Sequence, residues 1–383
     1  MKLLGRLLLI FCGILSALVI AELVLRIIPH QQDVVPFLEY YDAPCFKNGT
    51  FFWFGFKKNN RCIVKSKVKA FPDFEIRTNS LGLRGGELIS PKPNNSVRVL
   101  FIGDSFTLGW GVKEEESYPD VVGKILQKKY PSKKIEIVNA GLIASSTGYD
   151  YLVIKNLISV INPDIVVIGF YPANDIYEPK YITKWSLDKD GLPIASRMPR
   201  AFVDSKGEMY SAISPIPFNL TFLSNFRLTF VMTNIASYFS KPQLPDVPFT
   251  YIKMCVFEPN CHYLDQTKNK IKNLFVVMNS LTKQFNSKLV VVIIPAEFQI
   301  YTETRMAKYL IPYSIFPDKR KLPSQEFGYF FSKNNIDYLP LLPVFDQHLD
   351  DKPFYAKDDH WNSLGHNIAG QAIEQKIEQY ISE

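Results

Sequence analysis

Histidine and cysteine are both scarce in this chain, which contains five of each among 383 residues. No two cysteines have the CxxC spacing typical of a structural zinc site, and the only nearby imidazole is His262, beside Cys261. The net charge is +7, but the basic residues are spread along the chain and form no single stripe with interleaved aromatics. These absences argue against a zinc-binding module and against a dedicated nucleic-acid-binding protein.

The composition is that of a folded protein, since 47% of the residues are hydrophobic and 21% are charged. At about 150 residues per domain, the length predicts two to three units. No internal repeat is present. We interpret the chain as one elaborated catalytic domain preceded by an anchor.

The N-terminal segment indicates targeting to a membrane. An uncharged apolar run covers residues 7–21 and follows Lys2 and Arg6. Continued through residue 25, the run is long enough to span a bilayer if Glu22 lies at the interface. Because the basic residues stand before the run, we expect the N-terminus to face the cytoplasm and the rest of the chain to face outward.

Two other interpretations of this segment fit less well. Val19 and Ala21 can serve as the small residues of a signal-peptidase site, but the apolar run is long for a cleaved signal and lacks a polar region before that point. Cys12 follows Phe11, where a lipoprotein signal needs a small residue, so Cys12 is interpreted as an apolar side chain. We therefore predict an uncleaved signal anchor: one transmembrane helix in the cell membrane, with the catalytic domain on the periplasmic or extracellular side.

The remaining four cysteines fall into two local groups beyond the anchor. In an oxidising compartment such groups form disulfides, and we predict the pairs Cys45–Cys62 and Cys255–Cys261. Two reduced and chemically inert pairs are the alternative.

Short apolar runs alternate with helical patterns through most of the chain, which predicts an α/β fold with a parallel sheet. The predicted strands cover residues 97–102, 135–138, 164–170, 288–294 and 336–341, and the predicted helices cover 118–130, 148–160, 264–285 and a C-terminal segment that begins at Asn362 or Ser363. The third strand is apolar throughout, as expected for a strand that is buried on both faces.

Three regions follow from these patterns. Residues 1–30 are the predicted anchor, residues 31–95 an irregular leader that packs on the domain, and residues 96–383 the catalytic domain. Within the domain, a segment at about 176–263 is rich in proline and aromatic residues and does not alternate. Because this segment follows a strand end, we predict an insertion over the substrate cleft.

A candidate nucleophile stands where the first predicted strand ends, in Gly103-Asp104-Ser105. Ligands of open α/β sheets bind at this edge, but a serine hydroxyl needs a base to become reactive. Among the histidines, His360 has Asp358 two residues before it, and such a carboxylate can hold the Nδ1 proton and leave Nε2 as the base.

The other histidines lack such a neighbourhood. His366 lies within the predicted terminal helix and is interpreted as a packed, hydrogen-bonded side chain, and His30, His262 and His348 have no suitable carboxylate pattern.

Two further strand ends can supply donors for a developing oxyanion. Gly141 can offer an unobstructed backbone N–H, and Asn174 can offer its side-chain amide. The neighbouring carboxylates Asp104 and Asp175 are interpreted as loop braces.

Together these residues resemble the four namesake blocks of the SGNH (GDSL-type) hydrolase superfamily, with Ser105, Gly141, Asn174 and His360 in the family's order. The most specific pieces are Gly-Asp-Ser-Phe-Thr-Leu-Gly-Trp-Gly from residue 103 and Asp-Asp-His-Trp-Asn-Ser-Leu-Gly-His from residue 358. The chain departs from the family pattern at Pro172, which stands in a usual glycine position, and at Lys357, which stands where an aspartate commonly precedes the histidine by three residues.

The spacing of Asp358 from His360 is similar instead to the Asp-x-His of membrane-anchored relatives that handle acyl groups on exopolysaccharides. The resemblance therefore implies Asp358 as the third member of the triad, with Asp359 as the competing choice. It also implies a three-layer αβα sandwich with a mostly parallel sheet, as in flavodoxin-like SGNH hydrolases. No metal or organic cofactor is implied.

The resemblance implies a serine hydrolase with Ser105, Asp358 and His360 as the triad, and an oxyanion hole made by the Ser105 N–H, Gly141 and Asn174. Such an enzyme removes or transfers small O-acyl groups, such as acetyl, on a cell-envelope polysaccharide, as a carboxylic ester hydrolase or an O-acyltransferase. The alternatives are an accessory protein to a membrane-bound O-acyltransferase and a lipid esterase. An acylated glycan and the membrane are the expected partners.

Overall fold

The computed structural model describes residues 2–27, 34–36, 45–48, 52, 54–65, 71–176, 184–197, 200–204, 209–212, 255–258, 261–301, 319–356 and 358–382. The chain forms two compact units. The smaller unit comprises Met1–Tyr40 and Pro199–Asp246, and the larger unit comprises Tyr41–Met198 and Val247–Glu383. The predicted insertion is therefore divided between the units, and residues 177–183, 198–199, 205–208, 213–254 and 259–260 of it lie outside the described residues.

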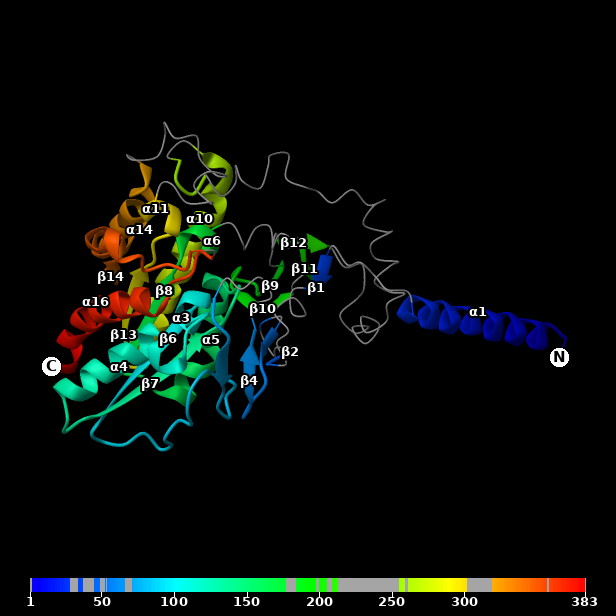
Figure 1. Ribbon diagram of the computed structural model, residues 1–383, viewed down its shortest axis with the longest axis horizontal. Helices are drawn as coiled ribbons and strands as arrows, with labels where there is room; N and C mark the ends of the chain where they lie inside the picture. The colour runs from blue at the N-terminus through cyan, green and yellow to red at the C-terminus, as the bar shows by residue number, and fades with distance from the viewer. Residues whose placement is uncertain are drawn as a thin grey trace. The chain divides into compact units, whose positions relative to one another are not determined.

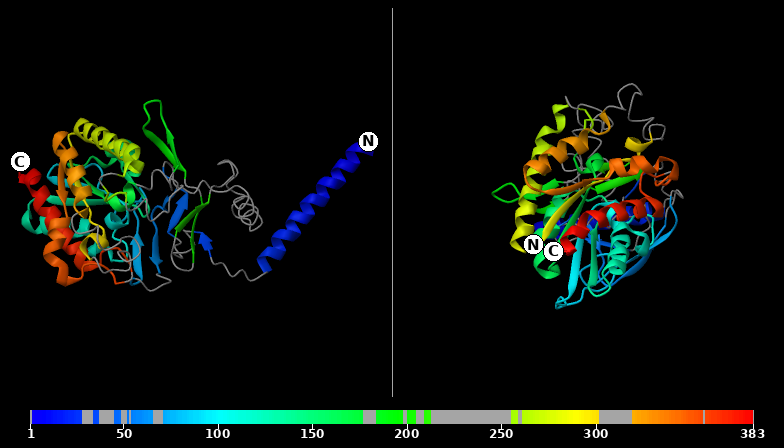
Figure 2. Two further views of the ribbon diagram at one scale, coloured as in Figure 1. Left: turned by 90° about the horizontal axis from the view of Figure 1, so that it is seen from above. Right: turned by 90° about the vertical axis from the view of Figure 1, so that its left-hand side faces the viewer.

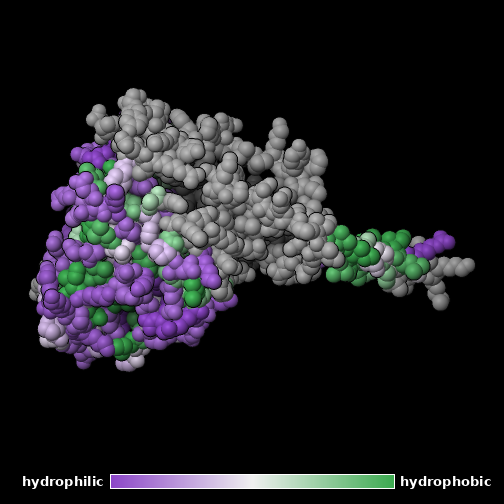
Figure 3. Space-filling view, viewed as in Figure 1, coloured by the Kyte–Doolittle hydropathy of each residue, from purple (hydrophilic) through white to green (hydrophobic). Residues whose placement is uncertain are grey.

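The smaller unit contains a long helix and a short sheet. Helix α1 covers Lys2–Ile27, and many of its apolar side chains, such as Leu9 and Ile20, are exposed (Figure 3). Within the part of the chain that the structure describes, no helix has the length and apolar character needed to cross a membrane. The anchor thus stays a prediction. Strand β11 (Arg200–Asp204) pairs antiparallel with both β1 (Val34–Pro36) and β12 (Met209–Ala212).

The larger unit is built on a five-stranded sheet in the order β14-β13-β8-β6-β7, and every pairing in it is parallel (Figure 1). The strands are β6 (Ser96–Gly103), β7 (Lys134–Gly141), β8 (Ile165–Phe170), β13 (Lys288–Ile293) and β14 (Asp337–Pro340). Counted along the chain, this order is 2-1-3-4-5, which is the flavodoxin-like arrangement. All six residues of β8 are buried, as the apolar run predicts.

Helices cover both faces of this sheet (Figures 1 and 2). Helices α4 (Tyr118–Lys129) and α16 (Ser363–Ser382) pack against each other, and α5 (Thr147–Ile161) packs against α10 (Asp265–Gln284). Right-handed connections between parallel strands place the two pairs on opposite faces. This three-layer sandwich confirms the predicted fold class.

Helix α14 (Leu322–Lys333) is an element that the sequence analysis missed. The rings of Phe327 and Phe331 contact those of Phe170 and Phe275, so α14 lies beside α10. Parallel strands need a crossover connection, usually a helix. A helix between the last two predicted strands, after residue 294 and before residue 336, could therefore have been predicted.

Several short elements complete the larger unit and were also not predicted. The short helices are α3 (Ser105–Leu108), α6 (Pro172–Asp175), α11 (Glu297–Ile300) and α15 (Leu342–Phe345), with 3₁₀ turns η1 (Glu114–Glu116), η3 (His262–Leu264) and η4 (Asp346–Asp351). The antiparallel hairpins are β2 (Phe46–Asn48) with β3 (Phe54–Phe56), β4 (Arg61–Val64) with β5 (Phe74–Arg77), and β9 (Lys184–Leu187) with β10 (Pro193–Arg197).

Arg84 connects the leader to the loop that follows the candidate nucleophile. Its side chain is 3% exposed and donates to the carbonyl oxygens of Leu108, Gly109 and Val112. The guanidinium carries its donors in a fixed fork, so these three acceptors fix the position of the loop. The part of the leader around Arg84 is therefore a structural component of the larger unit.

The structure pairs Cys45 with Cys62 and Cys255 with Cys261, as predicted. The Cα atoms of the two pairs are 5.5 and 5.2 Å apart. The first disulfide joins the two hairpins of the leader, where the Lys57 N–H also donates to the Cys45 carbonyl oxygen. Cys12 is free.

Candidate active site

Ser105 is the first residue of helix α3, directly after strand β6. Gly103 has φ of 152°, and a Cβ atom there would lie 2.3 Å from Thr107 Oγ1 and 2.7 Å from the Gly169 carbonyl oxygen. Only glycine permits this sharp and crowded turn. The strand-turn-helix geometry thus presents the serine at the carboxyl edge of the sheet, where ligands of this architecture bind.

His360 reaches the same edge from a loop near the C-terminus. Its Nε2 lies 2.7 Å from Ser105 Oγ, although the two residues are 255 positions apart. The Asp358 carboxylate binds Nδ1 of the same ring and also accepts the His360 backbone N–H at 2.9 Å. These contacts form a Ser-His-Asp arrangement in which Nε2 faces the hydroxyl that it must deprotonate.

The loop that carries the histidine is held by backbone bonds. The Tyr355 N–H donates to the His360 carbonyl oxygen at 3.0 Å, and Phe354 forms a bridge with Trp361. The Trp361 side chain is fully buried and contacts Phe106, whose ring centroid also lies 5.1 Å from that of the His360 imidazole. Aromatic packing therefore fixes the position of the imidazole.

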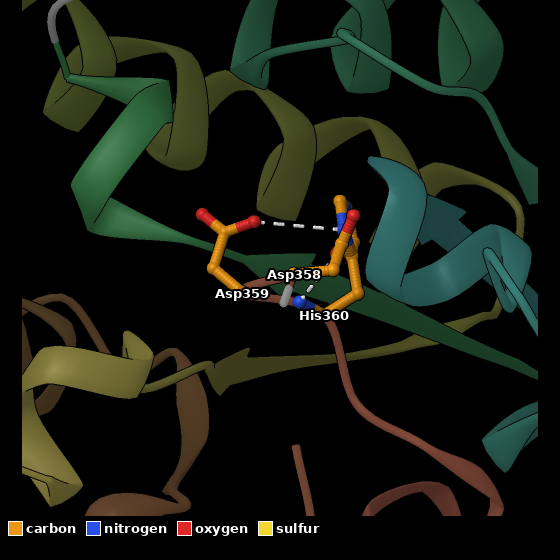
Figure 4. Close-up of side chains that lie close together, drawn as sticks. All are labelled: Asp358, Asp359 and His360. Atoms are coloured by element: carbon orange, nitrogen blue, oxygen red, sulfur yellow. Dashed lines mark hydrogen bonds and ion pairs between the residues drawn. The ribbon is translucent and has the colours of Figure 1, made fainter. Parts of the chain in front are cut away.

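Asp359, the competing choice for the third member, lies farther from the ring. One of its carboxylate oxygens is 3.6 Å from His360 Nδ1, beyond hydrogen-bonding distance, and its side chain is 37% exposed against 18% for Asp358 (Figure 4). The structure thus brings Asp358, and not Asp359, into direct contact with the imidazole. Lys357 lies outside the described residues.

The electrostatics of the pair suit a general base that becomes a cation during the reaction. Burial by itself disfavours the imidazolium. The charge and hydrogen bond of Asp358, together with the charges of Asp359 and Asp104, outweigh burial and raise the pKa of His360 to about 9. Burial likewise opposes the charged form of Asp358, yet contact with His360 lowers its pKa. A carboxylate in this position stabilises the imidazolium that forms when the serine proton is taken.

His366 is buried, as the sequence analysis interpreted it. Its Nδ1 accepts the Tyr118 N–H at 3.3 Å, its ring stacks on that tyrosine, and burial lowers its pKa to about 3. His262 and His348 bind Asp265 and Asp351 near the surface. His30 lies outside the described residues.

Gly141, the third predicted oxyanion donor, is closely packed and its N–H is hydrogen-bonded. Its N–H donates to Asn139 Oδ1 at 2.9 Å, and a Cβ atom there would lie only 2.2 Å from the Leu108 nitrogen. The glycine is needed because α3 packs directly on the end of β7. In this structure the N–H thus already has an acceptor, and its oxyanion role stays a prediction.

The other two predicted donors lie at the site edge. The Ser105 N–H is the first of helix α3, where no intrahelical acceptor exists. The Asn174 side chain comes from the short helix α6, directly after β8, and its Nδ2 donates to Asp104 Oδ2 at 3.2 Å. Pro172 begins this helix, a position that suits its fixed φ angle and its lack of an N–H. Asp175 accepts the Tyr171 N–H at 2.8 Å and thus braces the loop.

Asp358, Asp359 and His360 are also the only group among the described residues whose side chains could together hold a metal ion. The imidazole, however, is already bonded on both nitrogens, to Asp358 and to Ser105. The Asp-His couple explains this cluster without an ion.

Taken together, the side chains can carry out nucleophilic acyl transfer. Ser105 can attack a carbonyl carbon, and His360 can take the hydroxyl proton and later return it to a leaving group, while Asp358 holds the imidazole in the required tautomer. The Ser105 N–H and the Asn174 amide are the donors available for the negative charge that develops on the carbonyl oxygen.

No family model and no curated protein matches the chain, whereas solved structures do. One is a catalytic mutant of Axe2, an acetylxylan esterase from Geobacillus stearothermophilus, at 16% identity and a TM-score of 0.41, covering 73% of this chain and 94% of that chain. Another is TesA, at 10% identity and a TM-score of 0.39, covering 74% of this chain and 99% of that chain. With identity and TM-score both low, the fold assignment rests on the strand order, and the site assignment on its side chains.

Proposed function

We propose that this protein is a serine esterase of the SGNH type, which cleaves or transfers small O-acyl groups through an acyl-serine at Ser105. The observation that carries the proposal is the 2.7 Å contact between Ser105 Oγ and His360 Nε2, with Asp358 on the opposite ring nitrogen. A serine hydroxyl is activated by such a base, and the base needs such an orienting carboxylate.

The proposed substrate is an ester on a cell-envelope glycan. Two disulfides in the larger unit favour a chain that works in an oxidising compartment, outside the cytosol. We further propose that helix α1 and its flanking basic residues direct the domain to that side of the membrane. Acylated glycans are polymers that carry ester groups and occur outside the cytosol.

The reaction has two halves. Attack by Ser105 Oγ on the ester carbonyl forms a C–O bond, and collapse of the tetrahedral intermediate expels the alcohol, which receives the proton from His360. Water that gives its proton to the same imidazole then releases the acid and restores the serine. A sugar hydroxyl in place of this water would give an acyltransferase with the same residues.

The test compares wild-type protein with Ser105→Ala for acetate release from a short-chain ester and for labelling by a fluorophosphonate. Loss of both in a folded variant is the expected result. Equal labelling of the two proteins would refute the acyl-serine, and full envelope acylation in cells that carry Ser105→Ala would favour the accessory role. A preference for long-chain esters over acetyl esters would favour a lipid esterase.

The location of the domain is tested separately. Cells are quenched with acid and their denatured protein is alkylated with and without prior reduction, which reports whether Cys45 and Cys62 are paired. A reduced pair in the native compartment would contradict the outward placement. The mass of the isolated chain shows whether the N-terminal segment is retained.

A further inference from the structure

Asp104 is a buried carboxylate that the reaction described above does not use. It directly precedes the nucleophile, and its side chain is 1% exposed. Both of its oxygens accept hydrogen bonds: Oδ1 from the Phe106 N–H at 2.9 Å and Oδ2 from Asn174 Nδ2 at 3.2 Å. One side chain therefore joins the helix that carries Ser105 to the amide on the neighbouring strand end.

The bond to Asn174 determines which end of its amide faces the nucleophile. A carboxamide has a donating and an accepting end of nearly equal shape, and its partners decide between the two orientations. An ionised carboxylate only accepts, so it holds the Nδ2 end toward residue 104. Asn174 Oδ1 is buried and has no partner among the described side chains and backbone. A rotated amide would bring this oxygen against the carboxylate.

The orientation matters because Nδ2 carries two hydrogens. One is used by Asp104, whose main chain continues directly into Ser105, and the second is left for a group bound at the nucleophile. Turned the other way, the amide would present an oxygen to the developing negative charge and oppose it.

We propose that Asp104 is a positioning residue that holds the Asn174 amide as an oxyanion donor. The proposal rests on the proposed function, since it assigns a role within the same site. It goes beyond the interpretation of Asp104 as a loop brace, because it adds a role in the reaction.

The helix cap alone does not explain a carboxylate here. Serine or asparagine caps the first turn of a helix as well as aspartate does. Burial raises the pKa of Asp104 to about 6, so the charged form is held at an energetic cost. Two donors converge on this side chain, however, and a carboxamide or hydroxyl cannot accept both in the observed geometry. The second accepting oxygen, Oδ2, which binds the Asn174 amide, is the feature that requires aspartate.

The test is a double-mutant cycle with Asp104→Asn, Asn174→Ala and the two combined, assayed with a short-chain ester. We expect Asn174→Ala to lower kcat about 100- to 1000-fold, as for other oxyanion donors. Asp104→Asn should lower kcat by about tenfold to 100-fold with KM changed less than threefold, since the lost bond acts on the transition state. The kcat of the combined variant should lie within threefold of the kcat of Asn174→Ala, because Asp104 acts through the amide.

Asp150→Asn is the matched control. Asp150 is another carboxylate that is 1% exposed, it interacts electrostatically with Asp104, and no hydrogen bond joins it to Asn174 among the described residues. Its kcat should stay within threefold of wild type. An equal loss in Asp150→Asn would assign the effect to the loss of any buried carboxyl group near the site and would overturn the proposal. Wild-type kcat in Asp104→Asn, or losses that multiply in the combined variant, would also overturn it.

Two further measurements keep the result decisive. If Asp104→Asn does not fold, as judged by its thermal unfolding, Asp104→Ser replaces it, because serine keeps a cap for the Phe106 N–H but cannot also bind the amide. Ser105→Ala is assayed in parallel. If it retains activity, the proposed function fails; if only Asp104→Asn retains activity, the positioning role alone fails.

Discussion

Replacing Asp358 by asparagine should cost far more activity than the same change at Asp359. Asp358 binds His360 Nδ1 directly, whereas the nearest Asp359 oxygen is 3.6 Å from that nitrogen. A carboxamide at position 358 either offers an N–H to Nδ1, which selects the wrong tautomer, or accepts from it without stabilising the imidazolium by charge.

The size of the loss follows from the electrostatics of the pair. The pKa of His360 is held at about 9 in place of 6.5, and Asp358 is the largest contributor that raises it. At 1.36 kcal/mol per pKa unit, the net difference corresponds to about 3 kcal/mol of imidazolium stabilisation. At a pH above about 9, where the imidazole starts neutral, the loss of this stabilisation corresponds to a factor of roughly 100 in rate. Selection of the wrong tautomer adds to this, up to a total of about 10⁴ in a comparable triad.

The assay measures kcat and KM for Asp358→Asn and Asp359→Asn with one short-chain ester, after thermal unfolding has shown that both variants are folded. We expect kcat to fall at least 100-fold for the first and less than fivefold for the second, with KM nearly constant. Equal losses in both variants, or a loss below tenfold in Asp358→Asn, would refute the assignment.

Three other predictions follow from individual residues. Since the base must be neutral, kcat/KM should rise with pH and level off above the pKa of His360, about 9. Folding raises this pKa, so the stability that His360 contributes is fully present below about pH 6.5 and is lost as the pH rises through 9. Unfolding measured across this pH range checks the second effect. Gly141→Ala should destabilise the fold by about 3 kcal/mol or more in chemical denaturation, because its Cβ would lie 2.2 Å from a backbone nitrogen; a change below 1 kcal/mol would contradict the close packing. Arg84→Met should cost about 3 to 5 kcal/mol because it removes the hydrogen bonds of the guanidinium to three buried carbonyl oxygens. The exposed Arg61→Met should change stability by less than 0.5 kcal/mol.

The residues proposed for catalysis could be selected from the sequence because their signals are local. A strand that ends in Gly-Asp-Ser fixes where the serine stands, and a carboxylate two residues before a histidine can meet its ring through a short loop. The apolar runs located the five strands of the parallel sheet to within a few residues, because a strand that is buried on both faces permits few polar side chains.

The remaining features depend on residues that are far apart in the sequence. Nothing near Gly141 indicates that Asn139 takes its N–H, or that α3 packs on it so closely that a side chain is excluded. The sequence left Asp358 and Asp359 as alternatives, and the loop geometry distinguished them by distance.

The sequence by itself thus determined the fold class and selected the candidate active-site residues, since periodicity and short motifs are properties of neighbouring positions. Only the tertiary structure decided which donors are free, which carboxylate reaches the imidazole, and that Asp104 holds Asn174 across 70 residues of chain. Hydrogen-bond partners are selected by distance and direction in space, and a linear pattern does not contain these quantities.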